Sequence, residues 1–220
     1  MSAIQIKKSS LTLRAGKRAM AHIEHNGLQP ADIAILPGAA GGPKGIGLQG
    51  LDLALFGDWL PRTPRVRTLI GASIGSWRFA SACLPDPVAG IKRLGELYTS
   101  QRYAKGVSMQ EVSQSCRKLL HDLLQDQDAE ILANPLYHLN VVVVKSHGLM
   151  VHDRKGALGL GLSAVIGNNL LRRKRLARHF ERLVMHDQRA QPPLGRLEDF
   201  RSHFHPLAAG NLRQSLLASA

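Results

Sequence analysis

The chain has 220 residues, 44% of them hydrophobic and 20% charged, and this composition excludes disorder along its whole length. Its 29 lysines and arginines against 16 acidic residues give a formal charge of +13, which fits either an anionic partner or a solvated basic surface. Two cysteines outside any CxxC pair exclude a disulfide framework, and no apolar run reaches the roughly 18 residues of a membrane span. The N-terminal segment lacks the apolar core of a signal peptide, which predicts a cytoplasmic protein.

Along the first part of the chain, short apolar strands alternate with helical patterns. Apolar spacing and the proline and glycine residues between the segments define their limits. In chain order they are a surface helix over 11–25, a strand over 32–36, a glycine-rich loop over 38–45, a helix over 46–59, a strand over 66–70, a turn over 71–75 and a helix to about Leu84. This order predicts a parallel sheet covered by helices.

The rest of the chain continues the pattern. The expected segments are helices over 87–132, a central strand over 138–146 that contains the fully apolar run 141–144, a glycine-studded apolar segment over 156–167, a basic segment over 172–182, a polar stretch over 188–193 and a helix over 211–217. The sequence therefore predicts one domain over 1–220 with an α/β fold, in which helices cover both faces of a mostly parallel central sheet as a three-layer α/β/α arrangement.

The pentapeptide Gly71-Ala72-Ser73-Ile74-Gly75 fits the pattern GxSxG between an expected strand and an expected helix. A nucleophilic serine needs a sharp turn that raises its hydroxyl above the sheet edge, and Gly71 and Gly75 leave room for close backbone contact. Ser73 would then begin the helix, where the dipole and free N–H groups favour negative charge. The pattern also fits a plain small-residue turn that packs a helix on a sheet.

The glycine-rich loop 38–45 has three interpretations, and the first two fit only in part. As a phosphate-binding P-loop, it has Pro43 in place of the second glycine and Gly45 in place of the Ser or Thr that binds Mg²⁺. As a GxGxxG dinucleotide fingerprint, it has Ala40 in place of a glycine. A phosphate- or nucleotide-binding module therefore stays an alternative hypothesis.

The third interpretation of the loop is an oxyanion hole. Acyl transfer needs N–H groups aimed at the charge that develops on the carbonyl oxygen, and Gly41, Gly42 and Ile74 can donate them. Lys44 would anchor the loop or add positive potential, unless it is only a solvated side chain. Gly45 would support the end of the loop.

Together, the loop and the serine turn resemble the patatin-like phospholipase family. The loop of that family follows the pattern Gly-Gly-Gly-x-Arg/Lys-Gly, which Gly41, Gly42, Lys44 and Gly45 match, while Ala40 replaces the first glycine. A helix and a strand separate the loop from the serine motif, as in the family. The segment 210–220 is similar to the helix that precedes the family's catalytic Asp-Gly pair.

The resemblance implies a patatin-like hydrolase with a Ser–Asp dyad, no histidine, and neither a metal nor an organic cofactor. An aspartate would remove the proton of Ser73, which would attack a carboxylic ester of a phospholipid or another lipid, as in a phospholipase A or lysophospholipase. None of the ten aspartates precedes a glycine, so no aspartate is assigned. The domain is expected to stop before its catalytic Asp segment, and the 220 residues alone are expected to be catalytically incomplete.

A Ser–Asp–His triad of the α/β-hydrolase type is a further hypothesis. Asp187 or Asp199 with His203 or His205 follows Ser73 in the chain order that such esterases use. The two histidines would also suit a metal ion, but no third ligand has matching spacing, so no metal is expected.

The basic segment 172–182 fits a solvated helix, a helix on an anionic membrane surface or a nucleic-acid patch. Its basic run consists of Arg172, Arg173, Lys174 and Arg175 and continues to Arg178 and Arg182. Leu176, Phe180, Leu183 and Val184 fall on one face of a helical pattern. With a lipid substrate, peripheral contact with an anionic membrane is expected and nucleic-acid binding is not. The preceding residues 157–166 fit either a flap over an acyl pocket or core packing.

Overall fold

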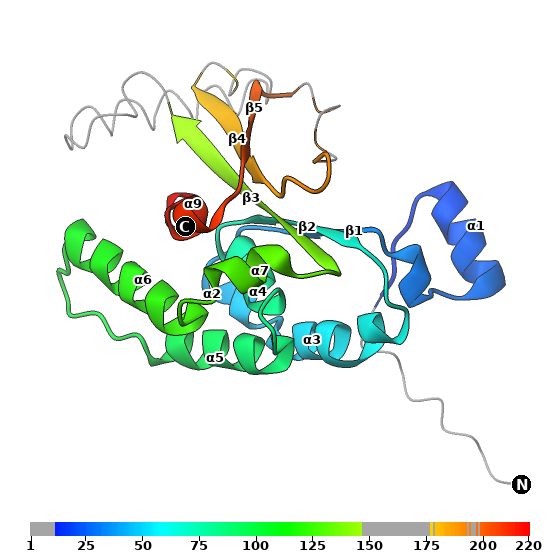
Figure 1. Cartoon of the computed structure of the whole chain (residues 1–220), viewed down its shortest axis with the longest axis horizontal. Coiled ribbons are helices and arrows are strands. Elements are labelled where there is room, and N and C mark those ends of the chain that lie inside the picture. The colour runs from blue at the N-terminus through cyan, green and yellow to red at the C-terminus, as the bar shows by residue number, and fades with distance from the viewer. Residues whose placement is uncertain (1–11, 147–176, 178, 193, 195–196, 198) are drawn as a thin grey trace, which may run out of the picture.

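The computed structural model describes residues 12–146, 177, 179–192, 194, 197 and 199–220, whose arrangement Figure 1 shows. The basic run at 172–175 and the expected flap at 157–166 lie outside the described residues. Within the described ranges, no helix combines the length and the apolar character that crossing a bilayer requires.

A five-stranded sheet forms the centre of the fold, with its strands in the order β1-β2-β3-β4-β5. Its strands are β1 (Ile35–Gly38), β2 (Arg67–Ala72), β3 (Tyr137–Ser146), β4 (Phe180–His186) and β5 (Ser202–Pro206). β1, β2 and β3 run parallel, β4 is antiparallel to β3, and β5 is parallel to β4. The prediction of an α/β fold with a mostly parallel sheet is confirmed.

The helices follow the expected order along the chain. They are α1 (Lys17–Asn26), α2 (Pro43–Ile46), α3 (Gln49–Ala54), α4 (Ile74–Ala82), α5 (Pro87–Ser100), α6 (Met109–Leu124), α7 (Asp128–Ala133) and α9 (Ala209–Ser219). Local signals explain where the longer helices begin. The Asp86 side chain caps α5 just before Pro87, and Ser108 and Glu111 form a capping box at the start of α6.

The main apolar core lies between the sheet and these helices. Tyr137, Leu139, Val141 and Val143, at alternate positions of β3, are buried in one cluster with side chains of α4, α5, α6 and α9. Figure 1 shows helices α2 to α7 and α9 on this side of β1, β2 and β3. The core thereby fixes α4 against all three strands, while a helical layer on the other face stays a prediction.

Several expected elements have different limits in the structure, and the helix expected over 11–25 begins only at Lys17. The strand expected over 32–36 begins only at Ile35, because Pro30–Asp32 form a 3₁₀ turn, η1, in which the Asp32 carboxylate accepts the Gln29 N–H at 2.8 Å. The helix expected over 46–59 is divided into α2, α3 and a π-helical turn, η2 (Leu55–Trp59). Three glycines in this segment weaken a continuous helix.

The helical face expected around Phe180, Leu183 and Val184 is wrong. These residues belong to β4, which pairs with β3 and places Val184 opposite Val142. The pairing with a distant strand outweighs the local helical pattern, because it satisfies backbone groups that β3 would otherwise leave open. The arginine of this strand, Arg182, donates to Asp199 at 2.9 Å.

Candidate active site

Ser73 lies in the turn between β2 and α4, where it is the N-cap residue of the helix. Its backbone has φ 52° and ψ −129°, a conformation that costs a non-glycine residue about 1–3 kcal/mol. Among the non-glycine residues that the structure describes, only Gln125 and Asp126 also have a positive φ. The Ser73 carbonyl accepts the N–H of Ser76 at 2.8 Å and its hydroxyl at 2.7 Å, which closes the turn.

Two glycines allow this turn to pack tightly. A Cβ added to Gly71 would lie 2.3 Å from the Cα of Ser76, and a Cβ added to Gly75 would lie 2.2 Å from the carbonyl oxygen of Gly38. Both separations are far shorter than a van der Waals contact, so a larger residue would displace the backbone. The two glycines therefore bring the strand end, the serine and the first turn of α4 together.

The glycine-rich loop packs against the first turn of α4 at both of its ends. Gly38 pairs with Gly71 across the parallel strands β1 and β2 and touches Gly75. At the other end of the loop, a Cβ added to Gly45 would lie 2.5 Å from the Cγ2 of Ile74. The loop and the serine turn therefore lie at the same edge of the sheet, as an oxyanion hole beside a nucleophile requires.

The backbone N–H groups of Gly41, Gly42 and Ile74 are the candidate donors of an oxyanion hole. Gly42 has φ 52° and ψ −131°, nearly the conformation of Ser73, and it precedes the short helix α2. The carbonyls of both glycines accept N–H groups of α2 at 3.2 and 2.9 Å, but no described residue accepts a hydrogen bond from their own N–H groups. The N–H of Ile74 belongs to the first turn of α4 and has no acceptor within the helix. These three groups can donate hydrogen bonds to an anionic oxygen.

A cavity of about 580 Å³ borders the loop beside β1. The loop contributes Ala39, Ala40, Gly41, Lys44 and Gly45 to its wall. Most of the remaining wall is apolar and comes from β1, the start of α3, η2 and α4, with Leu36, the α3 N-cap Leu48, Leu51, Leu55, Trp59 and Phe79. Its volume lies in the range of small-molecule pockets. Ser73 is not part of the described lining, so the cavity adjoins the loop rather than the serine.

A buried ion pair joins α3 to α4 at the wall of this cavity. Arg78 donates from Nε and Nη2 to the two carboxylate oxygens of Asp52, each at 2.6 Å, and the residues are 9% and 3% exposed. Because α3 follows the loop and α4 follows the serine, the pair fixes one segment relative to the other. No local sequence pattern predicts this pair, although Asp52 is conspicuous as a charge within an apolar helical pattern.

Each of the two aspartates of the alternative triad is held by an arginine. Arg189 donates to Asp187 at 2.6 Å, and Arg182 donates to Asp199 at 2.9 Å. Asp187 follows β4, which is antiparallel to β3 and therefore ends where β2 and β3 begin. Ser73 follows the opposite, carboxyl end of β2. The structure does not bring Asp187 to the serine.

The two histidines of that triad lie on β5, which β3 and β4 separate from β2. Three strand spacings correspond to about 14 Å. His203 Nε2 lies 3.1 Å from the carboxylate of Glu181. Among the described residues, no group of three His, Cys, Asp or Glu side chains is placed to hold a metal ion.

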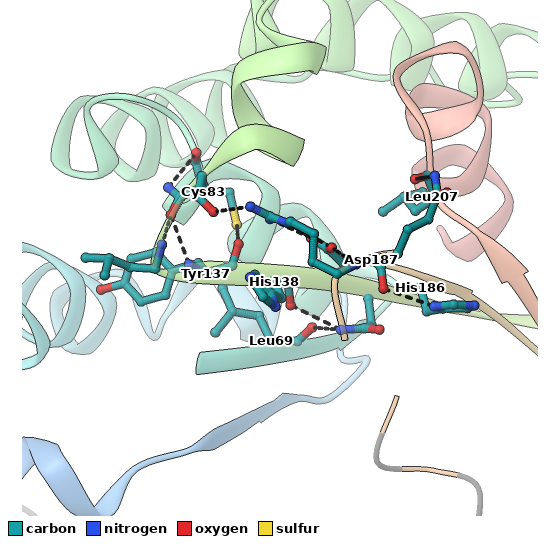
Figure 2. A network of polar contacts seen from close by, with 12 residues as sticks. Leu69, Cys83, Tyr137, His138, His186, Asp187 and Leu207 are labelled. Carbon is teal, nitrogen blue, oxygen red and sulfur yellow. Dashed lines mark hydrogen bonds and ion pairs between the residues drawn. The ribbon is translucent and has the colours of Figure 1, made fainter. Parts of the chain in front are cut away.

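A polar network that no sequence motif predicts lies at the edge of the sheet opposite the serine turn (Figure 2). Arg189 donates to the carbonyl of Asn134 at 2.8 Å, and Asn134 donates to the carbonyl of Cys83 at 3.0 Å. Burial disfavours the ionised form of Asp187, but hydrogen bonds from Arg189 outweigh it and lower the pKa of that carboxyl. Burial lowers the pKa of His138 because it disfavours the charged imidazole. The network ties the segment after β4 to the ends of α4 and α7.

Comparisons with known proteins give no relative on which a family assignment can rest. A scan against protein-family models found no match, and searches of curated proteins and of solved structures likewise found none. The likeness to patatin-like phospholipases therefore depends on the loop and serine motifs of the chain itself.

Proposed function

We propose that this chain is a patatin-like serine acyl hydrolase that cleaves lipid carboxylic esters with Ser73 as its nucleophile. The observation that carries the proposal is the positive φ of Ser73 in a strand-to-helix turn packed against a glycine-rich loop. A nucleophile elbow uses such a strained turn to expose the serine hydroxyl at the sheet edge. A three-layer α/β/α arrangement of the patatin type belongs to the same proposal.

The reaction would follow the usual course of acyl transfer through a covalent intermediate. The Ser73 Oγ attacks the ester carbonyl carbon while its proton passes to a base. The N–H groups of Gly41, Gly42 and Ile74 stabilise the negative charge on the carbonyl oxygen. The tetrahedral intermediate then expels the alcohol, which takes up the proton, and water hydrolyses the acyl-serine to release the acid.

The base of this reaction is not among the described aspartates. In the family that the chain resembles, the base lies in an Asp-Gly pair, and none of the ten aspartates of residues 1–220 precedes a glycine. Asp52, Asp187 and Asp199 each bind an arginine. The pKa of Asp187 and the pKa of Asp199 are lowered, which makes these two carboxylates poor proton acceptors. The proposal therefore assigns Ser73 as the nucleophile and assigns the base to none of the described aspartates.

The cavity beside the loop supports an apolar acyl group as the substrate. Its wall is largely aliphatic and aromatic, and each buried CH₂ group of a ligand contributes about 0.8 kcal/mol. The formal charge of +13 supports approach to an anionic membrane, with Arg172, Arg173, Lys174 and Arg175 as the proposed peripheral contact.

Hydrolysis of nitrophenyl esters tests the proposal. Because no base is assigned in the chain, imidazole is added as an external base. Under these conditions, wild-type protein should cleave the octanoate ester faster than the acetate ester, because the longer chain fills the apolar cavity. Ser73→Ala should abolish this activity, whereas Ser113→Ala, which changes an exposed serine of α6, should leave it unchanged. A wild-type rate that does not exceed the rate of Ser73→Ala would refute the proposal.

A further inference from the structure

Ser219, at the end of α9, makes two hydrogen bonds at the serine turn. Its hydroxyl donates to the carbonyl of Val142 on β3 at 2.7 Å, and its Oγ accepts the N–H of Ser73 at 2.7 Å. The two serines are 146 residues apart in the sequence, so only the folded chain brings them together. This one hydroxyl therefore links α9, β3 and the proposed nucleophile.

The place of the hydroxyl follows from where β2 leaves the sheet. Ala72 pairs with Val142 in the parallel ladder, and continued pairing would direct the next N–H, that of Ser73, to the Val142 carbonyl. The chain instead turns at Ser73 with φ 52°, which ends the ladder. The turn separates the Ser73 N–H from the Val142 carbonyl. The Ser219 hydroxyl accepts from the first group and donates to the second, so both keep a hydrogen-bond partner.

Helix α9 is anchored firmly enough to fix this hydroxyl. Leu212 and Leu216 are fully buried, and the indole N–H of Trp77 on α4 donates to the Leu216 carbonyl at 3.0 Å. Arg213 contacts Asp128 at the start of α7 at 2.6 Å. Because Trp77 belongs to the helix that follows the serine turn, α9 contacts both the turn and the helix behind it.

We propose that Ser219 is a positioning residue, which holds the backbone of Ser73 in the conformation that presents its hydroxyl for attack. This inference rests on the proposed function, and Ser219 acts through the Ser73 N–H rather than by contact with the substrate. Without the hydroxyl, the Ser73 N–H and the Val142 carbonyl lose their shared partner, and the strained turn relaxes. Displacement of a reacting group by about 1 Å lowers the rate roughly 10²-fold.

The test compares three variants of the full chain with a fluorophosphonate probe, which phosphonylates nucleophilic serines. They are Ser219→Ala, Ser219→Thr and Ser215→Ala. Ser215 lies one turn earlier on α9, is buried, and donates to the Asn211 carbonyl at 2.8 Å, so its replacement is a matched loss of a hydroxyl from the same helix. For each protein, the maximal labelling rate at Ser73 and the half-saturating probe concentration are measured.

We expect Ser219→Ala to lower the maximal labelling rate roughly 10²-fold with an unchanged half-saturating concentration. Ser219→Thr keeps a hydroxyl and should restore most of the rate, and Ser215→Ala should keep the wild-type rate. Amide exchange at Ser73 should accelerate in Ser219→Ala and not in Ser215→Ala, because only the former loses the acceptor of that N–H.

Two results would overturn the inference while keeping Ser73 as a nucleophile. One is a Ser219→Ala variant that is labelled at the wild-type rate. The other is an equal loss in Ser219→Ala and Ser215→Ala, which would mean that α9 is only generally loosened. Wild-type protein that is not labelled at Ser73 would instead refute the proposed function, and the inference would fall with it.

Discussion

Gly75→Ala would force apart the two segments that form the candidate site. The added Cβ would lie 2.2 Å from the oxygen and 2.5 Å from the carbon of the Gly38 carbonyl, and 2.9 Å from the Ala39 carbonyl oxygen. These neighbours are backbone atoms, so no side-chain rotation can relieve the clash. Either the end of β1 or the first turn of α4 has to move.

The cost of this substitution has two opposing parts. Overpacking of a buried site costs about 1–3 kcal/mol. Because the clash here is with backbone of the facing strand, we expect a cost of about 3 kcal/mol, the upper end of this range. Alanine gains up to about 1 kcal/mol over glycine in a helix. We therefore expect the free energy of unfolding to fall by about 2 kcal/mol. Labelling of Ser73 should also slow, because the shift separates the loop from the serine.

Urea unfolding followed by circular dichroism measures the change in stability. Gly50→Ala in α3 is the matched control, because nothing lies within 4 Å of a Cβ added at Gly50. This control should match the wild type or exceed its free energy of unfolding by up to about 1 kcal/mol. If Gly75→Ala were as stable as Gly50→Ala, the close packing of loop and turn would be refuted.

Two further predictions concern buried side chains that can carry a charge. Asp52→Asn should lower the free energy of unfolding by about 3–5 kcal/mol, because Arg78 then stays buried without its carboxylate, and the paired change Asp52→Leu with Arg78→Met should recover most of the loss. Urea unfolding of Asp52→Asn and of the double variant measures these changes in the free energy of unfolding. An Asp52→Asn protein as stable as the wild type would contradict the role given to the ion pair. For His138, burial lowers the pKa in the folded chain, whereas the unfolded chain takes up a proton near the ordinary value of 6.5. The free energy of unfolding should therefore fall as the pH drops from 6.5 toward the lower folded-state pKa, and His138→Gln should lose this part of the pH dependence. If the free energy of unfolding depended on pH identically in His138→Gln and the wild type, the prediction for His138 would be contradicted.

The segments with strong local signals could be predicted from the sequence. A short strand over 66–70, followed by GASIG and a helix to about Leu84, indicated the strand-to-helix turn at Ser73, which the structure contains as β2 and α4. The glycine-rich loop followed a short strand in the same way. Because consecutive parallel strands end at the same edge of a sheet, the alternation of strands and helices also predicted that the loop and the turn would be neighbours.

The contacts that depend on distant residues could not be predicted. The bridge from Ser219 to Ser73 depends on where α9 docks, and the pair of Asp52 with Arg78 depends on how α3 packs against α4. The segment Phe180–His186 has apolar positions that fit a helical face as well as a strand. Its pairing with β3, which no local pattern specifies, decides between the two.

Mapping the residue that a fluorophosphonate probe modifies would decide whether Ser73 is a nucleophile. Tryptic cleavage after Arg67 and Arg78 releases one peptide that contains both Ser73 and Ser76. Fragmentation of this peptide in a mass spectrometer separates the two serines. We expect the phosphonyl adduct on Ser73 alone, and no adduct when the chain is unfolded in urea before labelling. An adduct on Ser76, or one that forms equally in the unfolded chain, would contradict the proposed chemistry.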